Sequence, residues 1–117
     1  MTPAKKHGVL GAPKKSAYSF ERWQFDWERQ YMEQLEEDAD VFAWTKNHKI
    51  RIPYIDFQSR KREYRPDFLV KLATGTVELH EVKGGHLKHM PDTKRKLEAG
   101  RRWCAERGIE FVLVTKE

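Results

Sequence analysis

The sequence has little cysteine and no long run of apolar residues. Cys104 is its only cysteine, so an internal disulfide is excluded, and a secreted disulfide scaffold or a cysteine-based zinc site is disfavoured. No apolar run approaches the ~20 residues that a membrane-spanning helix needs, and no signal-peptide core follows Met1. We therefore expect a cytoplasmic protein that does not enter a membrane.

The charge balance is basic. The 117 residues include 23 Lys and Arg against 18 Asp and Glu, which gives a formal net charge of +5 and a pI of about 9.4. A chain of this length forms one domain with one core. The positive charge favours a polyanionic partner, most simply nucleic acid, although ordinary basic proteins share this composition.

The first 17 residues differ from the rest in composition. They carry Lys5, Lys6, Lys14 and Lys15 with few large apolar side chains, which is typical of a flexible basic arm. Such an arm either lies along DNA phosphates or is a frayed terminus, and the sequence favours neither. We place the folded domain at residues 18–117.

The remaining pattern predicts an α/β domain in the order helix-β-β-β-helix-β. A first helix is expected after Ser19, with a buried stripe formed by Phe20, Trp23, Trp27, Tyr31 and Leu35. A second helix is expected from Pro91 to just before Gly108. Strands are expected at residues 50–54, 66–72, 76–83 and 110–115, with a short strand or a loop at 41–44. The last strand follows a helical crossover, so it should run parallel to the one before it and make the sheet mixed.

Two carboxylates and an amine lie on neighbouring predicted strands. Glu81 and Lys83 are two residues apart, so their side chains share one face of the strand. A three-residue hairpin loop at Ala73-Thr74-Gly75, with glycine in the left-handed third position, would pair Asp67 with Glu81. A two-residue loop would turn Asp67 to the other face. The three-residue loop therefore predicts that the two carboxylates face each other.

Two adjacent carboxylates are unfavourable without a cation. A small number of hard oxygen ligands is suited to Mg²⁺, and we expect that Mn²⁺ can replace it. A metal on Asp67 and Glu81 would polarise a phosphate and lower the pKa of an attacking water. Lys83 would orient that water or neutralise charge that develops on the phosphate. The alternative is a plain hairpin with a Lys–carboxylate contact on a solvated face. The apolar residues around Leu69 and Val82 favour the catalytic interpretation, because they predict a sheet covered on both sides.

Further charged residues are candidates for binding. Candidate phosphate contacts repeat at a seven-residue interval on the second predicted helix, with a solvated face as the alternative: Lys94, Arg95, Arg101 and Arg102. Either Lys94 or Lys96 could also reach the carboxylates. Zinc is disfavoured, because neither cysteine partners nor finger spacing accompany His80, His86 and His89.

The pattern Pro66-Asp67, a strand and turn, and then Glu81-Val82-Lys83 resembles the PD-(D/E)XK nuclease superfamily. More narrowly, residues 27–84 look like the endonuclease domain of the TnsA family of transposition proteins. They are also similar to nuclease domains attached to some restriction-type helicases. The matching segments are residues 28–31, 35–41, 52–54, 64–70 and 81–84.

This resemblance implies a restriction-endonuclease-like core and a Mg²⁺-dependent endonuclease that hydrolyses DNA phosphodiester bonds. It implies that Asp67 and Glu81 bind the metal, that Lys83 is catalytic and that Glu28 on the first helix assists. We add the backbone carbonyl of Val82 to the predicted metal ligands. A protein partner or a second copy in a homodimer would supply sequence specificity.

Other functions remain open on the sequence. A non-catalytic nucleic-acid-binding or assembly module could keep the same fold, and a zinc-binding regulator is a weaker alternative. The substrate is equally open among a transposon end, a branched junction, a restriction target, phage DNA and RNA.

Overall fold

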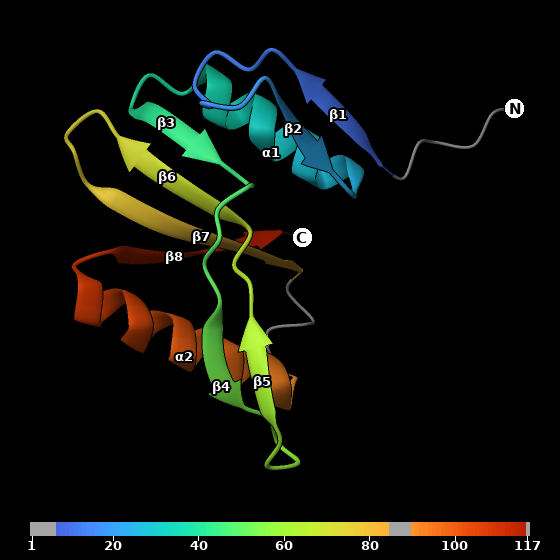
Figure 1. Cartoon of the computed structure of the whole chain (residues 1–117), viewed down its shortest axis with the longest axis vertical. Coiled ribbons are helices and arrows are strands. Elements are labelled where there is room, and N and C mark those ends of the chain that lie inside the picture. The colour runs from blue at the N-terminus through green and yellow to red at the C-terminus, as the bar shows by residue number, and fades with distance from the viewer. Residues whose placement is uncertain (1–6, 85–89, 117) are drawn as a thin grey trace, which may run out of the picture.

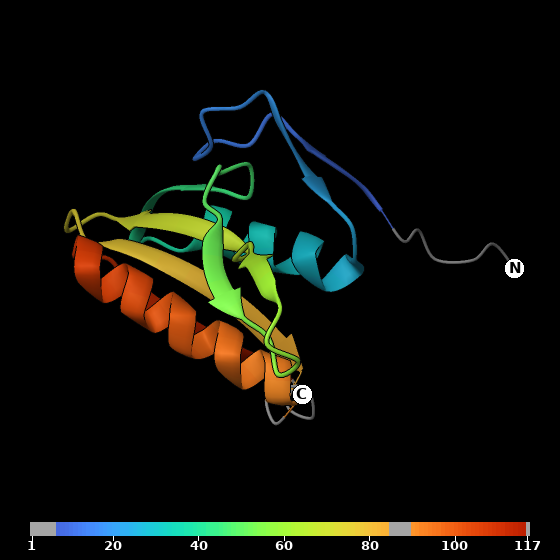
Figure 2. The same ribbon diagram turned by 60° about the horizontal axis from the view of Figure 1, so that its bottom comes forward.

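The computed structural model describes residues 7–84 and 90–116. Within this part of the chain, the centre is a four-stranded mixed sheet in the order β3-β6-β7-β8, formed by Val41–Thr45, Phe68–Leu72, Val77–Gly84 and Glu110–Lys116. Helix α1 (Asp26–Glu37) covers one face of the sheet and helix α2 (Pro91–Arg107) covers the other (Figure 1; Figure 2). The predicted mixed α/β architecture with helices on both faces is confirmed, and it is compatible with a restriction-endonuclease-like fold.

Alternate strand residues form a separate apolar core on each face of the sheet. On the α1 face, Phe68 and Val70 of β6 are fully buried in one cluster with Met32. On the α2 face, Leu79 of β7 is fully buried in a second cluster with Cys104. The strand period of two thus lets one short sheet support two cores.

The hairpin between β6 and β7 has the predicted register. Leu69 pairs with Leu79, and the Leu72 N–H donates to the Thr76 carbonyl at 2.8 Å. Gly75 has a φ of 94°, which is the left-handed conformation that the third loop position requires. The three-residue loop is therefore confirmed, and with it the register that brings Asp67 level with residue 81.

The second half of the fold also follows the sequence. Helix α2 begins with Pro91 and is closed by Gly108, whose φ of 69° allows its N–H to bond back to the Cys104 carbonyl. Strand β8 then pairs with β7 in parallel. The crossover through α2 is long enough for the chain to return to the same end of the sheet.

The predicted start of the first helix is wrong. Strand β2 (Phe20–Trp23) pairs in antiparallel with β1 (Gly8–Gly11), and α1 begins only at Asp26. In β2, Glu21 and Trp23 are buried while Phe20 and Arg22 are exposed, which is the alternation of a strand. The helical spacing of the aromatics had joined residues of two different elements. Residues 8–11, expected to belong to the flexible arm, are therefore a strand.

The strand predicted at 50–54 needs a second correction, because it is not part of the central sheet. Strand β4 (Ile52–Ile55) pairs with β5 (Lys61–Tyr64) in a two-stranded sheet of its own, and the central sheet instead contains β3, where the sequence indicated a short strand or a loop. The loop between them contains the buried Asp56, whose carboxylate accepts bonds from the Gln58 and Arg60 N–H groups, both at 2.9 Å. These hydrogen bonds close the loop of the β4–β5 hairpin. Figure 1 shows the β4–β5 hairpin extending away from the central sheet beside α2.

Replacement of Gly8 by alanine is expected to destabilise the fold by about 1–3 kcal/mol, the usual cost of overpacking a filled core. An added Cβ would lie 2.4 Å from Cζ2 of Trp23, which is buried. The matched control is Gly11→Ala on the same strand, because its Cβ would meet nothing within 4 Å; it should change the free energy of unfolding by less than about 0.5 kcal/mol. Urea unfolding followed by tryptophan fluorescence measures both. Equal stability of the two variants would contradict the packing of β1 on Trp23.

Candidate active site

Glu81 and Lys83 lie on the same face of β7 near its C-terminal end. The Lys83 ammonium is 3.2 Å from Oε2 of Glu81, and both side chains are largely buried. Val82, between them, points to the other face and joins the core beneath α1. The alternation predicted from the sequence places this charged pair on the α2 face of the sheet.

Asp67 lies immediately before β6, where pairing with β7 ends. Its N–H donates to the His80 carbonyl at 3.1 Å, and its Oδ2 accepts the Val82 N–H at 2.8 Å. The carboxylate therefore takes the place of a backbone carbonyl at the end of the ladder. This hydrogen bond from Val82 fixes the Asp67 carboxylate against β7, at the residue that follows Glu81.

The two carboxylates oppose each other electrostatically. Burial, together with the negative charges of Glu81 and Glu28, raises the pKa of Asp67 to about 7, although the hydrogen bond from the Val82 N–H and the charge of Lys83 act to lower it. Burial also raises the pKa of Glu81, although the hydrogen bond from Tyr64 and the charge of Lys83 act to lower it. Each carboxylate is thus harder to ionise than in water, so a cation at this point would be stabilising.

Tyr64 supports Glu81 from the β4–β5 hairpin. Its hydroxyl donates to Glu81 Oε1 at 2.6 Å, and the ring is buried beside Ile52. Burial raises the pKa of the Tyr64 hydroxyl, so this group remains a donor. Tyr64 was not predicted as a site residue, because the hairpin that presents it was not predicted.

His48 supports the backbone before Asp67. Its Nδ1 accepts the Ile50 N–H at 3.2 Å, so the proton lies on Nε2, which donates to the Pro66 carbonyl at 2.8 Å. Burial lowers the pKa of His48 and keeps the imidazole neutral. Residue spacing gives no signal for this contact, because His48 lies in an irregular segment.

Glu28 is buried at the start of α1 and has a structural role. Its Oε1 accepts the N–H groups of Gln24 and Phe25 at 2.6 and 3.1 Å, and its Oε2 is 2.7 Å from Nζ of Lys46. Its charge also acts on Asp67. The fold therefore brings Glu28 to the edge of the site together with Lys46, a residue that the sequence analysis did not identify.

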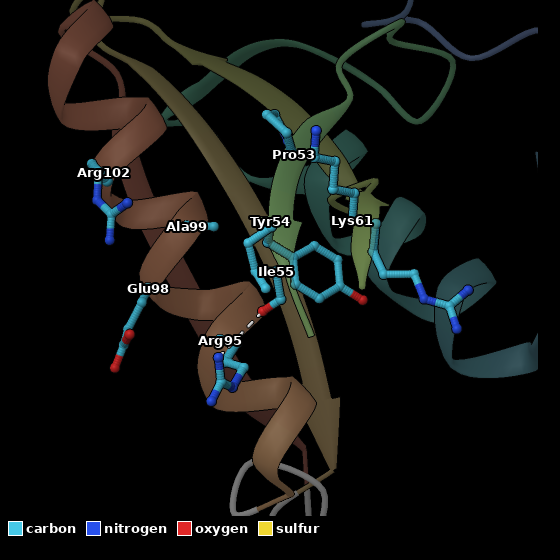
Figure 3. A pocket seen from close by; sticks show the side chains of 9 residues that line it. Pro53, Tyr54, Ile55, Lys61, Arg95, Glu98, Ala99 and Arg102 are labelled. Atoms are coloured by element: carbon cyan, nitrogen blue, oxygen red, sulfur yellow. Dashed lines mark hydrogen bonds between the residues drawn. The ribbon is translucent and has the colours of Figure 1, made fainter. Parts of the chain in front are cut away.

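The predicted basic stripe on α2 divides between two faces of the helix. Arg95 and Arg102 line a groove of about 440 Å³ between α2 and β4, together with Lys61 (Figure 3). Arg95 Nη1 is 3.5 Å from the Ile55 carbonyl, the contact that the dashed line marks in Figure 3. Arg101 instead lies over the ring of Phe111 on β8, and Lys94 is exposed to solvent.

Lys96, rather than Lys94, is the helix lysine directed toward the carboxylates. Its Nζ is 5.9 Å from the centre of the Tyr54 ring, and its positive charge favours ionised Glu81. On the sequence alone these two lysines were alternatives. Residue 96 is half-buried toward the hairpin, whereas residue 94 is on the exposed side of α2.

The two carboxylates of the site fit a hard cation that takes its other ligands from water or phosphate oxygens. In residues 7–84 and 90–116, no group of three or more His, Cys, Asp or Glu side chains could hold a metal. A zinc cage is therefore not formed by the described residues, while Mg²⁺ needs only one or two carboxylates beside water and phosphate oxygens. His80 donates to or accepts from Tyr31 and Glu78 with its two ring nitrogens. His86 and His89 lie outside the described residues.

A comparison with protein-family models matches residues 26–116 to the TnsA-like endonuclease N-terminal domain, from α1 to β8. The chain belongs to this family. The match includes Glu28, Asp67, Glu81 and Lys83, whereas the β1–β2 hairpin precedes it. A search of curated proteins finds no match. In the described part of this TnsA-like chain, no helix is long and apolar enough to cross a membrane.

Asp67→Asn is expected to flatten the pH dependence of stability in EDTA. The pKa of Asp67 is about 7 in the folded protein against a reference of 3.8. Between these values the unfolded chain loses the proton that the folded protein retains, so the free energy of unfolding falls as the pH rises; this contribution is fully present only below the lower pKa. The variant removes that loss, which we expect to be on the order of a few kcal/mol, and its amide oxygen can still accept the Val82 N–H.

Thermal unfolding across this pH window measures the effect. Asp40→Asn is the control, because Asp40 is exposed. Parallel curves for the wild type and Asp67→Asn would contradict a buried charge conflict at this site.

Proposed function

We propose that this protein is a Mg²⁺-dependent endonuclease that hydrolyses DNA phosphodiester bonds through a PD-(D/E)XK-type site. One observation carries the proposal: the half-buried Asp67 and the buried Glu81 lie together at the end of one strand pair, with Lys83 on the same face as Glu81. Membership of the TnsA-like endonuclease family supports a nuclease-related function.

Asp67 and Glu81 would hold the metal. The backbone of Val82 supports the third proposed ligand, because its N–H donates to Asp67 and the N–H and C=O of one strand residue point to the same side. Its carbonyl oxygen is therefore directed to the Asp67 side of β7, beyond the end of β6. Bound Mg²⁺ would polarise the scissile phosphate and supply a water of lowered pKa.

Lys83 would act on the attacking water or on the phosphate oxygens. Its ammonium is held by Glu81 and remains partly accessible, with a fifth of the side chain exposed. A fixed cation at this distance stabilises negative charge that develops on the phosphate, without reorganisation during the reaction. Lys96 adds a second positive charge near Glu81, and Glu28 would assist indirectly through its charge and its ion pair with Lys46.

Specificity would come from outside this catalytic arrangement. A single site cuts one strand in one encounter, so double-strand cleavage requires a second copy or a protein partner. We infer that the protein alone nicks DNA with little sequence preference and that a partner supplies the choice of site.

Asp67→Asn, Glu81→Gln and Lys83→Ala are each expected to lower the nicking rate by roughly 10²–10³-fold or more, the usual cost of removing a charged group that stabilises the transition state. Conversion of supercoiled plasmid to the open circle in Mg²⁺, Mn²⁺ or EDTA measures this rate. EDTA should abolish nicking by the wild type.

Two exposed residues provide matched controls. Glu106→Gln and Lys71→Ala alter an exposed carboxylate and an exposed amine, and both should retain the wild-type rate. Full activity of Lys83→Ala would contradict the mechanism. DNA binding without cleavage by the wild type in either metal would instead support the non-catalytic module.

The basic groove gives a prediction for binding. If Arg95 and Arg102 contact phosphates, the log of the affinity for duplex DNA falls with the log of the salt concentration with a slope of about −0.9 per phosphate, and the double alanine variant should reduce that slope by about two. Fluorescence anisotropy in EDTA measures it. Lys71→Ala with Arg107→Ala removes equal charge outside the groove as a control, and Lys94→Ala with Arg101→Ala tests the rest of the stripe. An unchanged slope in both stripe variants would assign it to a solvated face.

A further inference from the structure

A second pocket, of about 420 Å³, is joined to the edge of the candidate active site by one of its lining residues, Lys46, which pairs with Glu28. Its walls come from β2 and the segment before it, from the residues after β3, and from the segment that leads to Asp67. Its lining includes aromatic and cationic side chains: Tyr18, Phe20, Arg22, Lys46 and Arg65. One wall is therefore part of the β1–β2 hairpin, which precedes the residues matched to the family.

The pocket is held by the buried carboxylate of Glu21, which is 1% exposed. Its Oε2 accepts the hydroxyls of Ser16 and Thr45 at 2.5 and 2.7 Å, and its Oε1 accepts the Lys46 N–H at 3.1 Å. Arg65 Nη2 donates to the Lys46 carbonyl at 3.0 Å. Because these bonds join all three walls, the pocket is formed before any ligand arrives, which lowers the cost of binding.

The charge of the pocket suits a phosphate. Arg22, Lys46 and Arg65 line it with three cationic side chains, and Glu21, the carboxylate among its described lining residues, already has both oxygens hydrogen-bonded inside the protein. Lys46 forms an ion pair with Glu28, so the guanidinium groups of Arg22 and Arg65 are the cations that would bind an anion.

The aromatic side chains suit a nucleobase. Tyr18 and Phe20 are 41% and 43% exposed, and the Arg22 guanidinium carbon lies 5.6 Å from the centre of the Phe20 ring. Exposed aromatic rings and guanidinium planes are the surfaces on which unpaired bases stack. Bases inside a closed duplex already stack on their neighbours, so they gain little additional stacking from these rings.

The pocket is connected to the catalytic residues. Lys46 is 2.7 Å from Glu28, whose charge acts on Asp67, and Arg65 is two residues before Asp67. A nucleic acid strand whose phosphate lies at Asp67 would therefore have its neighbouring nucleotide within reach of this pocket.

We propose that the pocket binds an unpaired nucleotide next to the scissile phosphate, so that DNA with a single-stranded segment at the cut site is the preferred substrate. The base of the unpaired nucleotide stacks on Phe20 and Tyr18, and Arg22 and Arg65 neutralise the phosphates of that nucleotide. The placement beside a scissile phosphate rests on the proposed nuclease function, whereas the binding of unpaired nucleotides does not.

Binding is tested in EDTA with Lys83→Ala as the background, so that cleavage does not interfere. Fluorescence anisotropy compares a short single-stranded oligonucleotide with a dumbbell duplex whose two ends are closed by flexible non-nucleotide linkers, so that it contains no unpaired base. Phe20→Ala should weaken single-strand binding roughly 5- to 100-fold, the loss that alanine substitution of a stacking residue produces, and leave dumbbell binding within about twofold. Phe20→Trp should restore single-strand binding.

Phe42→Ala is the matched control, because Phe42 is an exposed phenylalanine on β3 that does not line the pocket. Equal single-strand affinities of Phe20→Ala and Phe42→Ala would overturn the proposal. An equal loss of dumbbell binding in Phe20→Ala would also overturn it.

Cleavage is scored separately with Lys83 intact and Mg²⁺ present. Preferential cleavage of a duplex with an overhang over the dumbbell, lost in Phe20→Ala, supports the whole proposal. A protein that binds single strands through Phe20 but cleaves neither substrate retains the pocket and overturns the hydrolytic function. A protein that cleaves both substrates without dependence on Phe20 retains that function and overturns the pocket.

Discussion

The register between β6 and β7 is the constraint on which the candidate site depends. The pairing of Leu69 with Leu79 brings Asp67 to the end of β6 next to Glu81. A shift of one residue would turn Asp67 toward the core beneath α1 and bury an unpaired charge there. The register is held at the loop by the positive φ of Gly75. Along the strands it is held because Phe68 and Leu79 are buried in the cores on opposite faces of the sheet. Site geometry and core packing therefore select the same pairing.

That register creates an electrostatic cost, and nearby hydrogen bonds offset it. The Val82 N–H stabilises the charge of Asp67, while the Tyr64 hydroxyl and Lys83 stabilise that of Glu81. These donors do not remove the conflict, because burial still raises the pKa of both acids. Structural carboxylates are usually placed where folding lowers their pKa, as Asp56 illustrates with its four hydrogen bonds at the hairpin loop. A pair held against that tendency is typical of a functional site.

The sequence predicted the β6–β7 hairpin, α2 and β8 because local signals there agree with the tertiary structure. A glycine at a left-handed loop position, Pro91 at the first turn and Gly108 at the C-cap each restrict the backbone directly. The predicted start of the first helix was wrong because Phe20 and Trp23 fit a helical spacing. The exposure of Phe20 and the burial of Trp23 instead follow strand pairing with β1, a contact distant in sequence. His48 and Tyr64 could not be assigned for the same reason: their partners are a carbonyl 18 residues away and a carboxylate 17 residues away.

The two hairpins attach to the core in different ways, and this affects what each can contribute. The β4–β5 hairpin supplies Tyr64 to Glu81, so a displacement of β5 would change the hydrogen bonding of a proposed metal ligand. The β1–β2 hairpin is attached through Glu21 to Thr45 and the Lys46 backbone, and the Lys46–Glu28 ion pair links it to the edge of the candidate site. Its exposed face, with Phe20 and Arg22, can therefore vary in sequence without altering the hydrogen bonds at Asp67 and Glu81. In the proposed nuclease, the groups assigned to the chemistry are therefore separate from the surface proposed to select the substrate.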